Sequence, residues 1–113
     1  MLRKSDKEKK EILFGDFTFR DGENVTIRKG VKWYNEKGMF LARPSDSDSN
    51  EVRQIEIVHT EIYKFEDLPA RVIDEEHDER ARNYSGLLKG MREAYGQDFR
   101  TAEYVTVIYF FVR

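Results

Sequence analysis

Alternating hydrophobic and polar positions predict β-strands along most of the first 65 residues. The alternation is clearest between Gly22 and Gly30, where Val25 and Ile27 lie on one face and the intervening polar residues on the other. Similar patterns predict strands over residues 12–19, 39–42 and 54–65, the last as one long bent strand or two short ones. The turn at 20–22 predicts a hairpin of the first two strands, and the polar run at 45–50 predicts a mobile loop.

The hydrophobic period changes after residue 65. Acidic residues ahead of Pro69 predict the start of a first helix, followed by a charged surface segment over residues 70–82. A second helix is predicted between Ser85, as its N-cap, and Gly96, because apolar side chains recur there at helical spacing. Residues 104–112 are β-branched or aromatic at nearly every position, which predicts a strand buried on both faces.

Together these elements predict an α+β domain, a curved sheet or barrel of five or six strands with two helices before the last strand. A chain of 113 residues supports one hydrophobic core, so we expect residues 12–113 to form one domain and residues 1–11 a flexible tail.

Cysteine is absent, which excludes disulfides, thiolate metal sites and a cysteine nucleophile. No apolar run approaches the roughly 20 residues that span a bilayer, and no signal peptide is recognisable. We therefore expect a cytoplasmic protein without a membrane partner, and a monomer.

The net charge of −2 argues against a protein that coats nucleic acid without sequence preference, because such binding depends on accumulated lysine and arginine. The charges are unevenly distributed, with basic residues frequent over 1–43 and acidic residues over 61–79. A basic face can therefore exist on a nearly neutral molecule, although the opposite charges can equally lie side by side and cancel.

The strand predicted at 25–28 and the residues after it carry side chains that suit an anionic, planar ligand. Thr26 offers a hydroxyl, Arg28, Lys29 and Lys32 offer positive charge, and Trp33 is the only indole in the chain. We expect these side chains to bind a nucleotide, with the cations on phosphate and Thr26 on the base or sugar. The alternative is an ordinary exposed strand, in which Trp33 simply packs against the sheet.

The chain contains two histidines, His59 and His77, which lack the i, i+4 spacing of a helical zinc site. His77 lies within an acidic run at residues 75–79, which we interpret as a solvated face rather than a metal site. These patterns lead us to expect no metal and no cofactor.

Several stretches, taken in order, resemble the ASCH domain, a member of the PUA-like superfamily. They are the Gly-x-x-x-Thr-x-Arg pattern at 22–28, the turn and strand at 38–42, the segment at 65–68, the helix at 87–95 and the closing strand at 105–110. The resemblance covers nearly the whole chain after residue 12. It implies a PUA-like β-barrel flanked by helices, with a cleft between barrel and helices that holds RNA or a modified nucleoside.

One branch of that family hydrolyses acylated cytidine and carries a Gly-x-Lys-x-x-Thr-x-Arg run. Thr26 and Arg28 match the Thr and Arg of that run, whereas Glu23 stands where the run has its Lys. That branch also uses a Glu from the segment before the second helix, and either Glu79 or Arg80 falls at its position here. The resemblance thus implies Thr26 and Glu79 as catalytic residues if this chain is an enzyme.

The sequence therefore predicts an RNA- or nucleotide-binding domain with its cleft between the strand at 25–28 and the segment at 77–84. One alternative is a small hydrolase of modified nucleosides, such as an N4-acylcytidine amidohydrolase, or an RNA-cleaving enzyme in the same cleft. Another is a protein-interaction module with an acidic face at 74–79. The expected ligand-binding residues are Thr26, Arg28, Lys29, Lys32, Trp33 and Tyr84.

Overall fold

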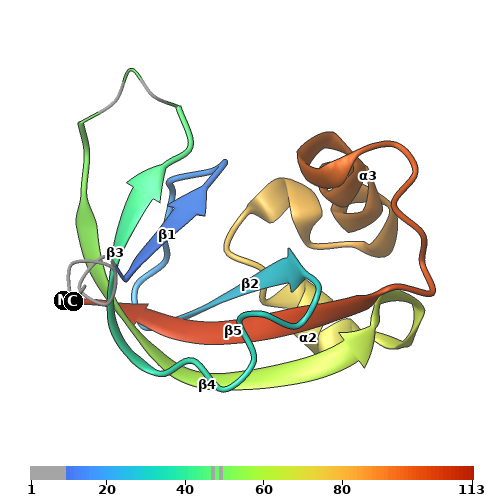
Figure 1. Ribbon diagram of the computed structural model, residues 1–113, viewed down its shortest axis with the longest axis horizontal. Coiled ribbons are helices and arrows are strands. Elements are labelled where there is room, and N and C mark those ends of the chain that lie inside the picture. The colour runs from blue at the N-terminus through green and yellow to red at the C-terminus, as the bar shows by residue number, and fades with distance from the viewer. Residues whose placement is uncertain (1–9, 47, 49) are drawn as a thin grey trace, which may run out of the picture.

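The computed structural model describes residues 10–46, 48 and 50–113, which form one curved sheet with helices at one end (Figure 1). Among these residues, five strands lie in the order β1-β3-β4-β5-β2. Every neighbouring pair is antiparallel except β1 and β3, which run parallel. The strands are β1 (Glu11–Phe14), β2 (Glu23–Lys29), β3 (Gly38–Pro44), β4 (Arg53–Lys64) and β5 (Tyr104–Val112).

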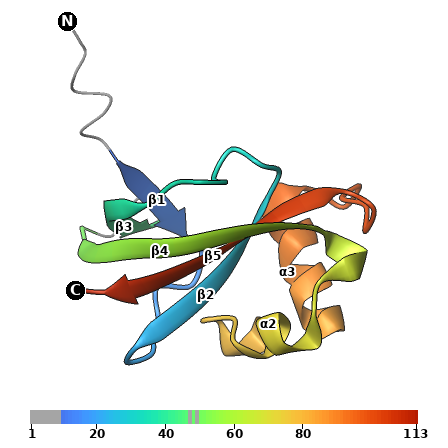
Figure 2. The ribbon, with the colours of Figure 1, turned by 90° about the horizontal axis from the view of Figure 1, so that it is seen from below.

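In the described part of the chain, two α-helices and two 3-10 turns connect β4 to β5. They are η1 (Phe65–Asp67), α2 (Ala70–Asp74), η2 (Glu79–Ala81) and α3 (Tyr84–Tyr95). Both α-helices lie on the same side of the sheet (Figure 2). This arrangement confirms the predicted α+β class with two helices before the last strand. None of the helices in these residues is long and apolar enough to cross a membrane.

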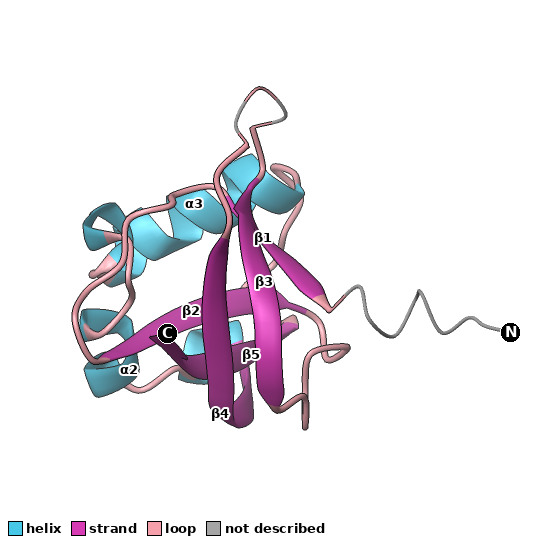
Figure 3. Cartoon of the chain, turned by 90° about the vertical axis from the view of Figure 1, so that its left-hand side faces the viewer, coloured by secondary structure: helices cyan, strands magenta, loops and turns pink. Residues whose placement is uncertain are grey.

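The predicted closure of the sheet into a barrel is wrong. β1 and β2 are the two edge strands, and no described residues pair one with the other. Figure 3 shows β3 and β4 running steeply across β2, so the sheet is strongly twisted but open. In the described residues, the outer edge of β2 is bridged only where Val25 meets Glu76. The rest of this edge stays open because the chain turns into η2 at Glu79 instead of continuing along the strand.

The predicted first strand and hairpin are also wrong in part. β1 ends at Phe14 rather than at residue 19, and it pairs with β3 instead of β2. The carboxylate of Asp16 accepts a hydrogen bond from the Thr18 N–H at 3.0 Å, a local turn that competes with strand pairing. Phe17 and Phe19 pack against the core, so this segment covers the sheet instead of extending it.

β4 is a single 12-residue strand, which decides between the two forms predicted for residues 54–65. Its register with β5 shifts between Ile57 and His59, where a bulge lets the strand bend.

The predicted strand at 39–42 is confirmed as β3. The polar loop at 45–50 joins β3 to β4, and positions 47 and 49 of this loop lie outside the described residues. Residues 1–9 of the predicted tail likewise lie outside them, whereas Glu11 begins β1.

β5 carries hydrophobic core on both of its faces, as predicted. Val105 and Val107 pack in a helix-side cluster, whereas Ile108 and Phe110 pack in a second cluster on the opposite face. The helix-side cluster also includes Val25, Ile27, Phe65, Val72, Leu87, Met91 and Phe99. The opposite cluster includes Ile12, Phe14, Phe40, Ile55 and Ile57, with Trp33 partly buried against it.

The N-cap of α3 is Asn83, not Ser85 as predicted. The side-chain oxygen of Asn83 accepts hydrogen bonds from the Gly86 N–H at 2.8 Å and from the Ser85 hydroxyl at 3.1 Å. Gly86 also lets α3 approach η2 closely, since a Cβ at this position would collide with the carbonyl oxygen of Arg80. The contact holds η2 against the start of α3. At the other end, Gly96 terminates the helix with a φ of 115°, as predicted.

The segment between α2 and α3 is not the solvated surface that its charges predict. Glu76 and His77 are only 3% and 6% exposed. Val72, Ile73 and Ala81 are buried as well, because this segment packs between β2 and α3. The acidic face expected at 74–79 is therefore interrupted at its centre.

Candidate functional site

A cleft of about 500 Å³ runs along the outer edge of β2. Its walls come from the loop after β1, from β2 itself, from the segment at 76–81 and from α3. The cleft therefore lies between sheet and helices, on the part of the β2 edge that no other strand covers. Its apolar lining includes Phe14, Leu87, Met91 and Ala94, and its polar lining includes Asp16, Thr26, Arg28, Glu76, Asp78, Glu93 and Tyr95.

Thr26 is a buried residue, 4% exposed, in the wall of this cleft. Because side chains alternate along a strand, Thr26 and Arg28 lie on one face of β2 and the core residues Val25 and Ile27 on the other, as predicted. The Thr26 hydroxyl makes no hydrogen bond to any residue that the structure describes. A buried hydroxyl without a partner is unfavourable by about 1–3 kcal/mol, so this group is available to a ligand.

Arg28 brings a partly buried positive charge to the cleft. Its guanidinium lies 4.6 Å from the centroid of the Phe14 ring, and Nη1 donates to the Leu13 carbonyl oxygen at 2.6 Å. Desolvation lowers the pKa of Arg28, and this effect is partly offset by Tyr95 and by the charge of Glu76. Arginine stays charged even so. No carboxylate in the described residues forms an ion pair with it, so the cleft holds a cation with donors left for a ligand.

Glu76 and His77 form a buried ion pair in the same wall. His77 Nδ1 lies 2.7 Å from Glu76 Oε1, and Nε2 lies 3.0 Å from the main-chain oxygen of Asp16. A carboxylate and a carbonyl are both acceptors, so this environment favours the protonated imidazole, which donates from both nitrogens. Burial by itself lowers the pKa of His77, but the hydrogen bond to Glu76 and its negative charge outweigh burial and raise it.

His77 also ties the walls of the cleft together. Its main-chain N–H donates to the carbonyl oxygen of Val25 at 2.8 Å, which attaches the segment to β2. Its ring is stacked on Phe19 and makes edge contacts with Phe14 and Phe110. One residue, through its main chain and its ring, thus fixes the loop after β1, the edge of β2 and the 76–81 segment relative to one another.

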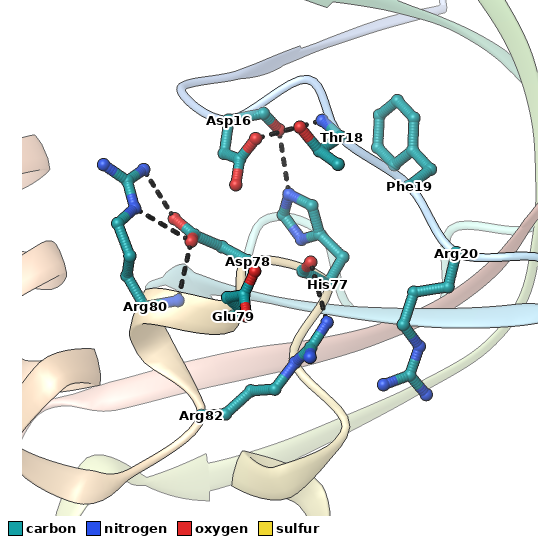
Figure 4. A pocket seen from close by; sticks show the side chains of 9 residues that line it. All are labelled: Asp16, Thr18, Phe19, Arg20, His77, Asp78, Glu79, Arg80 and Arg82. Carbon is teal, nitrogen blue, oxygen red and sulfur yellow. Dashed lines mark hydrogen bonds and ion pairs between the residues drawn. The ribbon is translucent and has the colours of Figure 1, made fainter.

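A smaller pocket of about 190 Å³ adjoins the cleft and shares Asp16, His77, Asp78 and Arg80 with it (Figure 4). Arg80 donates to both carboxylate oxygens of Asp78, at 3.0 and 2.9 Å. Arg82 donates to the main-chain oxygens of Glu76 and His77, at 2.7 and 3.2 Å. Both guanidinium groups therefore make two hydrogen bonds each within the protein.

The sequence matches no protein-family model and no curated protein sequence. Among solved structures, the chain is similar to the crystal structure of an ASCH domain from Lactobacillus crispatus, with a TM-score of 0.60, 79% of this chain covered and 11% sequence identity. The chain has the ASCH-domain fold. It spans 63% of the length of that ASCH-domain chain, and a likeness at this identity concerns the fold alone. The resemblance of the ordered sequence motifs is thereby confirmed at the level of the fold.

Within this ASCH fold, Thr26 and Arg28 converge on the cleft from adjacent positions of one strand face. Glu79 lines the smaller pocket and not the cleft, whereas Arg80 lines both. The buried carboxylate that shares the cleft with Thr26 is instead Glu76. Glu23, at the position of the family's Lys, is exposed at the start of β2 and does not line the cleft.

The four other predicted ligand residues line neither cavity. Lys29 follows Arg28 on the opposite face of β2, and after it Gly30, with a φ of 81°, turns the chain away from the cleft. Trp33 packs against the sheet, which was the alternative prediction for this residue. Nζ of Lys29 lies 3.7 Å from Glu103, and Nζ of Lys32 lies 5.9 Å from the centroid of the Trp33 ring. Ring centroids are 5.6 Å apart for Trp33 and Phe40 and 5.2 Å apart for Tyr84 and Phe65.

No sequence pattern indicates that Glu76, His77 and Tyr95 belong to the cleft. Glu76 and His77 stand in a charged run, and only the long-range bridge to Val25 buries them. The helical spacing at 87–95 predicts Tyr95 on the apolar stripe of the helix, but the last turn of α3 lines the cleft. In the described residues, no three His, Asp or Glu side chains converge as metal ligands would.

Proposed function

We propose that this ASCH-fold domain binds a single nucleotide unit, free or within RNA, in the cleft along β2. The observation that carries the proposal is the pairing of a buried, unpartnered hydroxyl on Thr26 with a cation on Arg28 that feels the charge of Glu76 but forms no ion pair within the described residues. The two side chains are adjacent on one strand face and line one cleft. A ligand with an anionic group and a hydrogen-bonding group satisfies both.

The size and walls of the cleft support a nucleotide. Its volume of about 500 Å³ lies within the range of roughly 300–1,000 Å³ that is usual for small-molecule sites. Tyr95, which is 37% exposed, offers aromatic surface to a base, next to the buried apolar lining of Phe14 and Met91. Arg28 offers the planar, multiply donating group that suits phosphate.

The acidic residues around the cleft favour one nucleotide unit over a long stretch of phosphates. Asp16, Asp78 and Glu93 all line it, and of these Asp78 is neutralised by Arg80. Lys29 and Lys32, which the sequence predicts to bind phosphate, lie outside the cleft. An extended polyanion would meet repulsion beyond the unit that Arg28 holds.

Thr26→Val tests the proposal, because it removes the hydroxyl and keeps the shape of the side chain. We expect the free energy of unfolding to stay unchanged or to rise slightly, since the hydroxyl has no partner in the described protein to lose. Nucleotide affinity should fall about five- to tenfold, which corresponds to roughly one hydrogen bond. Calorimetric titration with the four nucleoside 5′-monophosphates and a short single-stranded RNA measures affinity, and urea unfolding measures stability.

Thr60→Val is the matched control. Thr60 is also buried, but its hydroxyl accepts a hydrogen bond from the Asn35 N–H at 2.8 Å. This variant should lose about 1 kcal/mol of stability and keep its nucleotide affinity. The proposal fails if no nucleotide and no RNA binds the native protein, or if the two variants bind equally well.

A nucleoside amidohydrolase is the second candidate, because Thr26 and the carboxylate of Glu76 line the same cleft. The chemistry requires a base to activate the threonine and a positive group near the developing oxyanion. Oε1 of Glu76 already accepts hydrogen bonds from His77 and from the Asp78 N–H, at 2.7 and 3.1 Å. Arg28 can supply the positive group, but none of the described residues that line the cleft is a lysine that could act as the base. These contacts favour binding over turnover.

We therefore expect the native protein to deacylate N4-acetylcytidine no faster than the Thr26→Val variant does. The measurement is release of cytidine over time, followed by chromatography with both proteins at equal concentration. Turnover by the native chain that disappears in Thr26→Val would establish the hydrolase in place of the binding domain.

A further inference from the structure

We propose that the main-chain N–H and C=O of Ile27 form the reading edge of the cleft and pair with the hydrogen-bonding edge of a nucleobase. The inference rests on the proposed nucleotide binding and deepens it. It assigns the recognition of the base to the backbone of β2, between the two side chains that hold the ligand.

The register of β2 fixes the direction of its main-chain groups. Gly30 N–H donates to the Tyr104 carbonyl oxygen of β5, at 2.8 Å. In an antiparallel pair, residues alternate between pointing both groups at the neighbouring strand and pointing both away. Positions 24, 26 and 28 therefore bond to β5, and positions 25, 27 and 29 point outward. The hydrogen bond from His77 N–H to the Val25 carbonyl oxygen confirms this parity independently.

Ile27 is the outward-pointing position that lies in the cleft. Val25 is covered by its bridge to Glu76, and Lys29 is exposed at the end of the strand. Ile27 is 5% exposed and lines the cleft, and no described residue hydrogen-bonds to its outward N–H or C=O. Buried main-chain N–H and C=O groups are nearly always hydrogen-bonded. A ligand in the cleft can therefore supply the hydrogen-bonding partner that these two groups of Ile27 lack.

The chemistry of the edge defines the class of ligand. One donor and one acceptor side by side match a base that presents an acceptor next to a donor, as the base-pairing edges of pyrimidines and purines do. Thr26 and Arg28 lie immediately before and after this peptide unit, so the remaining polar atoms of the nucleotide fall within their reach. The structure thus favours a base whose pairing edge is unmodified.

The test compares the four nucleoside 5′-monophosphates with counterparts methylated on the base-pairing ring nitrogen, N3 of pyrimidines and N1 of purines. Methylation removes one hydrogen bond to Ile27 and adds bulk against the strand, so affinity should fall about tenfold or more. In ¹⁵N-labelled protein, the Ile27 amide resonance should shift on titration, and its hydrogen exchange should slow in the complex. The Gly30 amide, which is bonded to β5, is the internal control and should keep its exchange rate.

Two outcomes overturn the inference, and they are distinguishable. If methylated and unmethylated nucleotides bind equally and the Ile27 amide does not respond, the reading edge is wrong while nucleotide binding stands. If no nucleotide binds at all, the proposed function fails, and the reading edge fails with it.

Discussion

His77→Ala lowers the free energy of unfolding by about 3–5 kcal/mol, because it leaves the Glu76 carboxylate buried without its partner. The two residues are 3% and 6% exposed, and Nδ1 of His77 lies 2.7 Å from Glu76 Oε1. The substitution also removes a ring that packs among Phe14, Phe19 and Phe110. Urea unfolding at pH 6 measures the change.

His59→Ala is the matched control, since the chain has two histidines and both face a carboxylate. The side chain of His59 is 57% exposed and lies 3.2 Å from Glu61. An exposed pair of this kind contributes less than about 1 kcal/mol. Similar losses from the two variants would show that the Glu76–His77 pair does not hold the cleft walls together.

The same pair makes stability depend on pH. Because the pKa of His77 is raised in the folded protein, its contribution is present in full below the ordinary histidine value of 6.5 and is lost as the pH rises through the raised value. Unfolding free energy should therefore decline from pH 6 into the alkaline range in the native protein. The decline should be absent from His77→Ala and present in His59→Ala.

Arg28→Ala reduces nucleotide affinity about ten- to a hundredfold, which corresponds to the loss of hydrogen bonds between a cation and an anionic group. Lys29→Ala, one residue along the same strand, should change affinity less than about twofold, because Lys29 lies outside the cleft beside Glu103. Arg28→Lys keeps the charge and should recover only part of the affinity, since lysine lacks the planar fork. Calorimetry at low salt measures all three variants.

Arg28 also donates to the Leu13 carbonyl oxygen, so unfolding curves of the same variants are needed to separate binding from stability. Equal affinity losses from Arg28→Ala and Lys29→Ala would show that the phosphate binds outside the cleft, on the surface that the sequence alone predicts. That surface comprises Lys29, Lys32 and Trp33.

The elements that the sequence predicted well are those whose pattern is local. β2 follows from the alternation of Val25 and Ile27 with Thr26 and Arg28, and that alternation also predicts the side chains of Thr26 and Arg28 on one face. β5 follows from a run of β-branched and aromatic residues that only a strand buried on both faces accommodates. The helical spacing before Gly96 likewise predicted α3.

The predictions that failed depend on contacts between distant parts of the chain. Nothing near residue 14 indicates that β1 pairs with β3, because strand partners are chosen by the whole sheet. The charged run around Glu76 and His77 predicts a solvated face. Their burial comes instead from a bridge to Val25, about fifty residues earlier in the chain. Lys32 and Trp33 are close to Arg28 in sequence, but Gly30 turns the chain away between them. Lys32 and Trp33 therefore lie outside the cleft that Arg28 lines.

A crystal structure of the protein with the nucleoside monophosphate that binds most tightly tests the central claim most directly. The account predicts the nucleotide in the cleft along β2, with its phosphate on the guanidinium of Arg28 and a hydrogen bond to the hydroxyl of Thr26. A nucleotide bound elsewhere, such as on Lys32 and Trp33, with the cleft unchanged, would contradict it.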